Sequence, residues 1–465
     1  MPRAHAKPLV LIVVDGLTPD VLEAAVGDPR MPALTALAGA GRYRRGVSTF
    51  PSLTPVCMSS IATGAHPDVH GIPHLVWYDR GEDRLVEYGS SLGAVLSAGA
   101  LRSLRDTIFG LNERHLSRRA VTVYESLEDA GLVPAAINVT CYRGRTRHLP
   151  TVRGLTPAAL GPRRFFYYSL FESDVTGAPF AVRNRAAGSV DAYATAAARW
   201  LVTRDGFDFL TFYLSDYDLA SHALGPGAAA EALAAADRAI QGLLDAAGGV
   251  DGFLERYAVI LCSDHGQSNV TEAVSLERRF DDLALRRRGA EARAELVLTA
   301  SNRAAMLYRL PRCRLDVRAL AERLDAEPGA GATLFLEDGE AVARRDGEEL
   351  RFAPAGDGWR TSGDEGLLEG PDALERSWAA LANPNAGEVL VSAAEGVEFA
   401  DLAGSHHAGG GSHGSLARAD SEVPLLLVGV DGDPLGIVDL APTVLRHFGV
   451  ELPAYAAARL AARVA

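Results

Sequence analysis

The sequence predicts an α/β fold with a mostly parallel central sheet that is flanked by helices. Short apolar runs, rich in leucine or β-branched residues, alternate with helical patterns along the chain. These runs are apolar along their whole length, which is typical of strands buried on both faces of a parallel sheet. The chain has 465 residues, of which 48% are hydrophobic. It is therefore long enough for one large domain that carries an insertion.

The predicted strands of this sheet end in polar residues. In chain order they lie within "LVLIVVDG" (9–16), "VPAAINVT" (133–140), "FLTFYLSD" (209–216), "YAVILCSDHG" (257–266) and "VPLLLVG" (423–429). Helices are expected at 20–26 after a "TPD" start, at 117–131 before Gly131, and at the alanine-rich stretch 228–247.

The character of the chain changes between about 276 and 387. Runs such as "TLFLEDGEAVARRDG" indicate strands joined by "DG" turns, and "LDVRALAERLDAE" indicates a helix. The stretch 355–370 is rich in Gly, Asp and Ser and is expected to be a loop, whereas 387–393 ("GEVLVSA") is expected to return to the core. We therefore divide the chain into a core (1–275), a small α+β cap insert (276–387) and a second part of the core (388–465).

Composition and charge restrict the classes of function and the cellular locations that fit the chain. The net charge of −13 argues against a general binder of nucleic acid or of anionic membranes. Four scattered cysteines (Cys57, Cys141, Cys262 and Cys313) favour buried free thiols in a reducing compartment. The first residues lack the apolar segment and cleavage site of a signal peptide, and no apolar stretch approaches ~20 residues. These observations predict a cytoplasmic protein without a membrane span.

Acidic residues follow three of the predicted strands. They are Asp15 after the first, Asp216 and Asp218 after the third, and Asp264, with His265, after the fourth. In open α/β sheets, ligands bind at the carboxyl ends of the strands. A single aspartate at such a position is commonly a helix N-cap or a turn residue, but three strand ends together favour a binding site.

Histidines add to this donor set. Asp218 and His222 are four residues apart, which places them on one face of a helix, either as two ligands of one cation or as an exposed i,i+4 pair. The glycine-rich loop "SHHAGGGSHGS" supplies His406, His407 and His413. Two zinc-like ions need three protein ligands each, and the chain offers Asp15, Asp218, His222, Asp264, His265 and His413.

The stretch "FPSLTPVCMSSIATGAHPDVHGI" (50–72) is dense in small alcohols. Two metals ~4 Å apart can clamp the attacking and leaving oxygens of a phosphoryl transfer, and a hydroxyl at such a site is readily ionised. We therefore interpret this stretch as the source of a nucleophile.

The motifs "VVDG", "PSLTP" followed by "ATGAHPDVHGI", "DLASHALGP", "SDHG" and "GSHGS" occur in one order along the chain. In this respect the chain resembles the nucleotide pyrophosphatase/phosphodiesterase branch of the alkaline phosphatase superfamily, over about 1–275 and 388–465. The resemblance implies an alkaline-phosphatase-like core and two zinc ions, other divalent metals being alternatives. It assigns Asp218, His222 and His413 to one zinc, and Asp15, Asp264 and His265 to the other.

The resemblance also implies a threonine nucleophile that contacts the metals. The family places it nine residues before the threonine of "TG" and sixteen before the histidine of "HG", and both spacings lead to Thr54. Thr49 in "STFPS" is the alternative, but it misses both spacings. His70 is expected to brace the loop. Cys57 is a candidate for substrate binding because it stands where the family often has asparagine, although a thiol is a poor hydrogen-bond donor to a phosphate oxygen.

Three further residues are candidates for substrate binding. Relatives that cleave nucleotides often carry a base-stacking tyrosine at the position of Tyr213, although a core aromatic is an equal interpretation. Tyr142 and Arg143 lie in "CYRGRTRH", which either grips a negative group of the substrate or is a solvated loop.

Together these features predict a two-zinc hydrolase that cleaves phosphodiester or nucleotide pyrophosphate bonds in small molecules through a covalent phospho-threonine. The alternatives are a phosphomonoesterase, a phosphonate (phosphonoacetate-type) hydrolase, or a metal- or nucleotide-binding protein without turnover. A sulfatase is disfavoured, because "VCMSSI" lacks the pattern needed to make formylglycine. The oligomeric state is left open.

Overall fold

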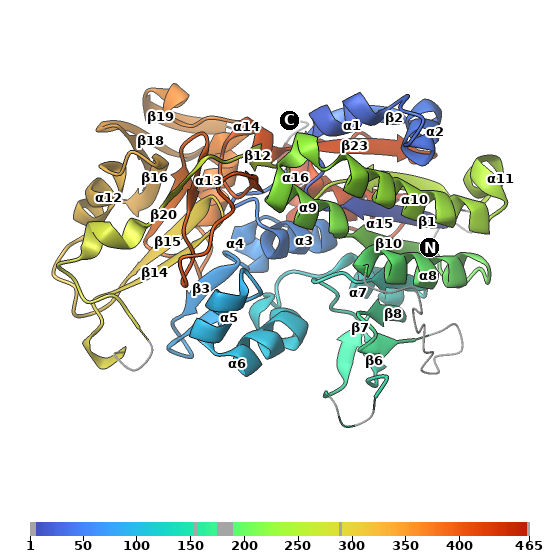
Figure 1. Cartoon of the computed structure of the whole chain (residues 1–465), viewed down its shortest axis with the longest axis horizontal. Coiled ribbons are helices and arrows are strands. Elements are labelled where there is room, and N and C mark those ends of the chain that lie inside the picture. Colours follow the sequence, from blue (N-terminus) through green and yellow to red (C-terminus); the bar gives the residue numbers. More distant parts are fainter. Residues whose placement is uncertain are drawn as a thin grey trace.

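The computed structural model describes residues 6–152, 154, 156–173, 189–287, 291–356 and 358–462. Residues 1–5, which open the segment considered above for a signal peptide, lie outside this range. Two sheets lie side by side, with the core sheet on the right in Figure 1 and a second sheet on the left. Within the described ranges, none of the helices is long and apolar enough to cross a membrane.

The core sheet has eight strands in the order β2-β23-β11-β1-β10-β5-β8-β9. The strands are β1 (Leu9–Val14), β2 (Arg42–Val47), β5 (Pro134–Ile137), β8 (Arg164–Tyr167), β9 (Phe171–Glu172), β10 (Phe209–Leu214), β11 (Ala258–Cys262) and β23 (Glu422–Val428). The strands from β11 to β8 run parallel, whereas β23, β2 and β9 pair antiparallel. The predicted mostly parallel sheet is confirmed.

Helices cover both faces of this sheet, which explains the continuous apolar strands. On β1, Leu9, Leu11 and Val13 pack into one apolar cluster with α3 (Thr54–Thr63), α7 (Val123–Asp129) and α15 (Leu440–His447). The alternate β1 residues pack with α2 (Pro32–Ala40), α8 (Val190–Val202) and α10 (Ala230–Ala246) on the other face. All six residues of β1 are buried.

Two predicted helices begin or end close to their expected bounds, and one begins later. Helix α1 spans Pro19–Ala25 and α10 spans Ala230–Ala246. The helix expected at 117–131 begins only at Val123, because Thr122 and Glu125 form a capping box that fixes its start.

The second sheet has seven strands in the order β14-β15-β20-β16-β17-β18-β19. They are β14 (Leu296–Ser301), β15 (Ala304–Arg309), β16 (Ala330–Glu337), β17 (Glu340–Arg345), β18 (Glu348–Ala355), β19 (Gly358–Gly363) and β20 (Val389–Ala393). Helix α12 (Val317–Asp325) packs on one face. The other face shares an apolar cluster with α13 (Ala373–Leu381) and with the core. This matches the expected α+β character.

Two expectations for this region are wrong. The stretch 355–370, expected to be a loop, contains the exposed edge strand β19, whose backbone pairs with β18 although its side chains are polar. The segment 387–393, expected to return to the core, forms β20 between β15 and β16. Its apolar residues are buried on both faces of the second sheet, so they carry the same pattern as a core strand.

Candidate metal centre

The carboxyl ends of three adjacent strands meet at the centre of the core sheet. Strand β1 lies between β10 and β11, so Asp15 follows the middle strand and Asp264 follows one neighbour. Asp218 lies in the first turns of α9 (Asp216–Leu224), which begins two residues after β10. The parallel register therefore brings together the acidic residues that the sequence places far apart.

Two groups of donors have their ligand atoms within 4.8 Å of one another. Asp15, Asp264 and His265 form one group, as the resemblance implied. The other group contains Asp218 and His413, but with His265 in the place expected for His222. The His222 Nε2 nevertheless lies 3.2 Å from Asp218 Oδ2, and its ring centroid lies 5.1 Å from that of His413. All six candidate ligands therefore converge.

Backbone carbonyls fix the orientation of the three histidines. The partner of Nδ1 is Gly411 O for His222 at 2.8 Å, Gly266 O for His265 at 3.0 Å and Ser52 O for His413 at 2.7 Å. Since a carbonyl oxygen only accepts, each Nδ1 carries a proton, and each Nε2 is the ring atom available to a metal. A histidine that binds a metal commonly shows this arrangement.

The carboxylates carry buried oxygens that the protein does not satisfy. Asp15 Oδ1 and Asp264 Oδ2 have no hydrogen-bond partner among the described residues. Burial, followed by the nearby carboxylates of Asp264 and Asp218, raises the pKa of Asp15 well above its ordinary value. Unpaired buried carboxylates are costly, and a divalent cation offsets that cost. The donor set of carboxylates and imidazoles thus fits zinc or a similar divalent metal.

Glycine is required beside Asp15. Gly16 has φ +69°, and a Cβ built there would lie 2.5 Å from Asp218 Oδ1. A side chain at this position would therefore push Asp218 out of the cluster, which explains the glycine of "VVDG".

Thr54 lies beside this cluster. It is the first residue of α3, it is partly exposed, and its Oγ1 lies 3.3 Å from His265 Nε2. Thr49 is buried, and its Oγ1 has no hydrogen-bond partner within the described ranges. His70 braces the loop as predicted, because its Nε2 contacts Ser60 Oγ at 3.1 Å and its Nδ1 accepts from the Ile72 N–H.

The structure does not bring Tyr142 and Arg143 to the site as binding groups. Both are buried, and the Tyr142 hydroxyl donates to the Ile108 carbonyl. The Arg143 guanidinium donates to Glu125 and to the carbonyls of residues 116, 117 and 120. These groups are committed to internal packing, which corrects their interpretation as substrate contacts.

Cys57 and Tyr213 also occupy internal positions, which for Tyr213 agrees with its interpretation as a core aromatic. Cys57 is buried, its Sγ lies 3.3 Å from Ser48 Oγ, and burial raises its thiol pKa, so it serves packing rather than the substrate. Tyr213 is only 3% exposed, which leaves no face for a nucleobase. Its hydroxyl instead donates to Asp15 Oδ2. The four cysteines are free and buried, as predicted.

Three further polar residues lie near the candidate ligands, and only His407 was among the donors named from the sequence. Gln267 Nε2 donates to Asp218 Oδ1 at 3.1 Å, and Asn302 Nδ2 lies 3.0 Å from His413 Nε2. His407 lies with its ring centroid 4.1 Å from that of His222. Only His407 belonged to a motif, whereas Gln267 and Asn302 carry no spacing signal.

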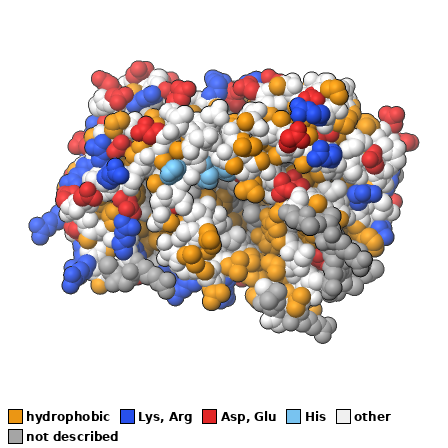
Figure 2. Space-filling view, viewed as in Figure 1, with side chains coloured by type: hydrophobic (Ala, Val, Ile, Leu, Met, Phe, Trp, Pro, Cys, Tyr) orange, Lys and Arg blue, Asp and Glu red, His pale blue; other side chains and the backbone are white. Residues whose placement is uncertain are grey.

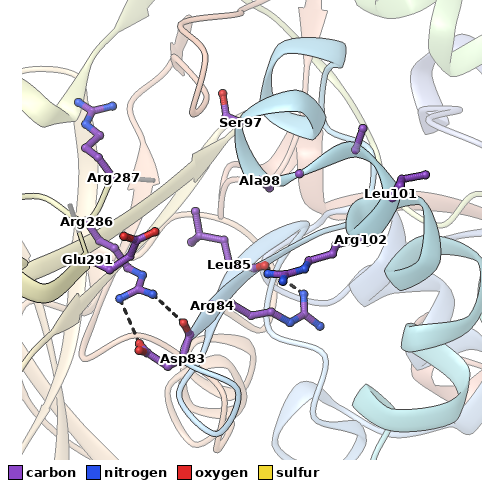
Figure 3. A pocket seen from close by; sticks show the side chains of 12 residues that line it. Asp83, Arg84, Leu85, Ser97, Ala98, Leu101, Arg102, Arg286, Arg287 and Glu291 are labelled. Carbon is purple, nitrogen blue, oxygen red and sulfur yellow. Dashed lines mark hydrogen bonds and ion pairs between the residues drawn. The ribbon is translucent and has the colours of Figure 1, made fainter. Parts of the chain in front are cut away.

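A separate cavity of about 720 Å³ lies between the β3–β4 hairpin (Val76–Asp79 and Arg84–Glu87), helices α5 (Leu92–Ala98) and α6 (Ala100–Arg105), and the side chains of Arg286, Arg287 and Glu291. Figure 3 shows Arg286 pointing to Asp83, with which it forms an ion pair of 3.1 Å. Arg84 is paired with Asp106. On the face seen in Figure 2, acidic and basic side chains are intermixed, and histidine side chains reach the surface near its centre. None of the six ligands lines the cavity.

Known proteins match both the sequence and the fold. The family described as type I phosphodiesterase / nucleotide pyrophosphatase matches residues 9–416. Phosphonoacetate hydrolase from Sinorhizobium meliloti 1021 in complex with phosphonoformate has a similar fold, with 18% identity, a TM-score of 0.60, and coverage of 95% of this chain and 96% of the other. Murine ectonucleotide pyrophosphatase / phosphodiesterase 5 is 13% identical, with a TM-score of 0.61 and coverage of 96% of both chains. The human protein of the same name is 14% identical, with a TM-score of 0.61 and the same coverage. The chain therefore belongs to the type I phosphodiesterase / nucleotide pyrophosphatase family, within the alkaline phosphatase superfamily.

Proposed function

We propose that the protein is a two-zinc hydrolase of small-molecule phosphoric esters, with phosphodiesters or nucleotide pyrophosphates as its substrates. The observation that carries this proposal is the convergence of the six ligands beside the Thr54 hydroxyl. Asp15, Asp264 and His265 would hold one ion, and Asp218, His222 and His413 the other. The ions, when bound, would polarise the phosphoryl group and favour ionisation of a hydroxyl at the site.

In the proposed reaction, the Thr54 Oγ1 attacks phosphorus and the bond from phosphorus to the leaving oxygen breaks, which gives a covalent phospho-threonine. A water molecule then attacks phosphorus, the bond to Oγ1 breaks, and the threonine is regenerated. Because Thr54 is the first residue of α3, its backbone N–H lies at a helix N-terminus, where it has no intrahelical acceptor and suits a phosphoryl oxygen.

The proposal is tested by comparing two threonine variants. Thr54→Ala should abolish turnover of an aryl phosphodiester and keep about two zinc ions per chain, because three protein ligands remain for each ion. Thr49→Ala should retain most activity. Zinc is measured by mass spectrometry. An active Thr54→Ala together with an inactive Thr49→Ala would show that the family spacing misassigns the nucleophile.

A phosphonate hydrolase is the second candidate, because a phosphonoacetate hydrolase shares the fold over nearly the whole chain. The zinc-loaded protein should be assayed in parallel on an aryl phosphodiester, an aryl phosphomonoester and a phosphonate. The ratio of the three rates decides between diesterase, monoesterase and phosphonate hydrolase. A zinc-loaded protein that is inactive on all three would favour a binder without turnover.

The buried free thiols are consistent with a reducing compartment, and we propose the cytoplasm as the location.

A further inference from the structure

The second sheet reaches the metal cluster through the turn between β14 and β15. Asn302 and Arg303 form this turn, and the Asn302 side chain is 7% exposed. Its Nδ2 lies 3.0 Å from His413 Nε2. The His413 ring stacks on the His265 ring with a centroid distance of 3.6 Å, and His265 Nε2 lies 3.3 Å from Thr54 Oγ1. The Asn302 amide and the Thr54 hydroxyl therefore flank the same pair of imidazoles.

Hydrogen bonds determine which end of the amide faces the cluster. The Asn302 Oδ1 accepts from the Ser301 hydroxyl at 3.0 Å, which leaves Nδ2 toward His413. The His413 Nδ1 donates to Ser52 O, so its Nε2 is an acceptor and matches an amide donor. Once Nε2 binds a metal, its lone pair is no longer available. The Asn302 Nδ2 then needs another hydrogen-bond acceptor close to the position of His413 Nε2.

The turn is held rigidly. The Arg303 N–H donates to the His413 carbonyl at 2.9 Å. The Arg303 side chain is fully buried and donates to both oxygens of Asp420 at 2.8 and 2.9 Å. A donor whose backbone is fixed in this way is preorganised for a ligand.

We propose that the Asn302 side-chain amide donates a hydrogen bond to a non-bridging oxygen of the substrate's phosphoryl group, an inference that rests on the proposed function of the metal centre. This amide supplies the donor that the buried thiol of Cys57 does not. A residue of the second sheet, rather than of the core, thus contacts the reacting group.

The left-handed backbone of Asn302, with φ +56°, offers a competing reason for asparagine at this position. Glycine adopts this conformation readily, so Asn302→Gly removes the amide and keeps the turn. The matched control is Asp338→Gly, which changes another left-handed residue, with φ +52°, in the turn between β16 and β17 of the same sheet.

The experiment measures the affinity of the zinc-loaded protein for inorganic phosphate, by calorimetry, together with zinc content and kcat/KM on an aryl phosphodiester. Asn302→Gly should weaken phosphate binding at least about tenfold and lower kcat/KM by about 10²- to 10³-fold, the usual cost of losing one oxyanion donor. Its zinc content should stay at the wild-type value, and Asp338→Gly should match wild type in all three measurements.

Unchanged phosphate affinity in Asn302→Gly would overturn the inference. Loss of zinc in this variant would also overturn it, since Asn302 would then act on the metal site and not on the substrate. If the wild-type protein hydrolyses no phosphoric ester, the proposed function fails, but the phosphate affinities of the two variants still decide the role of Asn302.

Discussion

His413 provides a direct test of the ligand set at the scale of single residues. It directly follows β22 (Gly411–Ser412), far along the chain from Asp218 and His222. His413→Ala should reduce zinc from about two ions to about one per chain, because one site keeps only two protein ligands. His406→Ala is the control, since its side chain is exposed and should not alter the zinc content. Unchanged zinc in His413→Ala would instead favour His407 as the ligand, because its ring lies beside that of His222.

Tyr213 illustrates how a residue without metal contact can support a metal site. Its hydroxyl donates to Asp15 Oδ2, which leaves Oδ1 for the cation. Tyr213→Phe removes this donor with little change in shape, and zinc affinity at one site should fall by about 10- to 100-fold. Competition with a chelator measures this affinity. The matched control is Tyr124→Phe, whose hydroxyl contacts Thr211 on the same strand. Equal zinc affinity in Tyr213→Phe and wild type would show that the Tyr213 hydroxyl does not support metal binding by Asp15.

The residues of the candidate metal centre could be predicted from the sequence. The neighbouring residues that contact them could not. Strand ends, the i,i+4 spacing of Asp218 and His222, and the family motifs indicated the six candidate ligands that the fold brings close together. Tyr213 and Asn302 act through contacts between segments that are distant in sequence, and no local pattern encodes such contacts. Buried Arg143 looked like a binding residue because charge in a sequence does not reveal an internal partner such as Glu125.

At the scale of elements, paired charges stabilise the second sheet in a pH-dependent way. Hydrogen bonds from Arg318 and then Arg351 lower the pKa of Glu337, at the end of β16, from 4.5 to about 2. A depressed folded-state pKa stabilises the fold above the unfolded value, so this contribution is complete above about pH 4.5 and is lost as the pH falls toward 2.

Glu337→Gln should therefore flatten the pH dependence of the free energy of unfolding between pH 4.5 and 2, measured by urea denaturation at a series of pH values. Glu272→Gln on β13 (Glu272–Val274) is the control, because the described residues provide no ion pair for Glu272. An identical slope for wild type and Glu337→Gln would show that these arginines do not stabilise the folded carboxylate.

The errors in element prediction have separate physical causes. Strand β19 was missed because an exposed edge strand needs only backbone pairing and can carry polar side chains. Strand β20 was placed in the wrong sheet because burial on both faces gives one apolar pattern whichever sheet supplies the neighbours. The pairing partner of a strand is a property of the folded chain.

At the scale of the whole molecule, one buried ion pair joins the second sheet to α14 (Arg418–Ser421), which follows His413 in the chain. Arg303 and Asp420 are both fully buried, and Asp420 also accepts from the Ser415 N–H and hydroxyl. Arg303→Ala leaves a buried carboxylate without its cation and should cost about 3–5 kcal/mol of unfolding free energy. Denaturant unfolding checks this value. Arg360→Ala, which removes an exposed ion pair with Glu340, should cost about 1 kcal/mol or less. An equal loss of unfolding free energy in the two variants would show that the Arg303–Asp420 ion pair does not stabilise the contact between the second sheet and α14.

The contacts between the second sheet and the core also make residues 276–387 unsuitable for deletion. The second sheet shares an apolar cluster with the core and extends through β20, so replacing 276–387 by a linker would remove the neighbours of β20 and expose apolar surface. The role of the second sheet beside the candidate metal centre is therefore better tested by single changes such as Asn302→Gly than by deletion.

The order of the ligands along the chain has a consequence for biosynthesis. Asp15 leaves the ribosome before His413, which is followed by β23, the strand that pairs with both β2 and β11. A nascent chain can therefore display most of the donors but cannot close both sites. Until His413 has been synthesised, the nascent chain carries Thr54 without the complete set of candidate ligands, so the proposed metal sites assemble only when the segments on both sides of the second sheet are present.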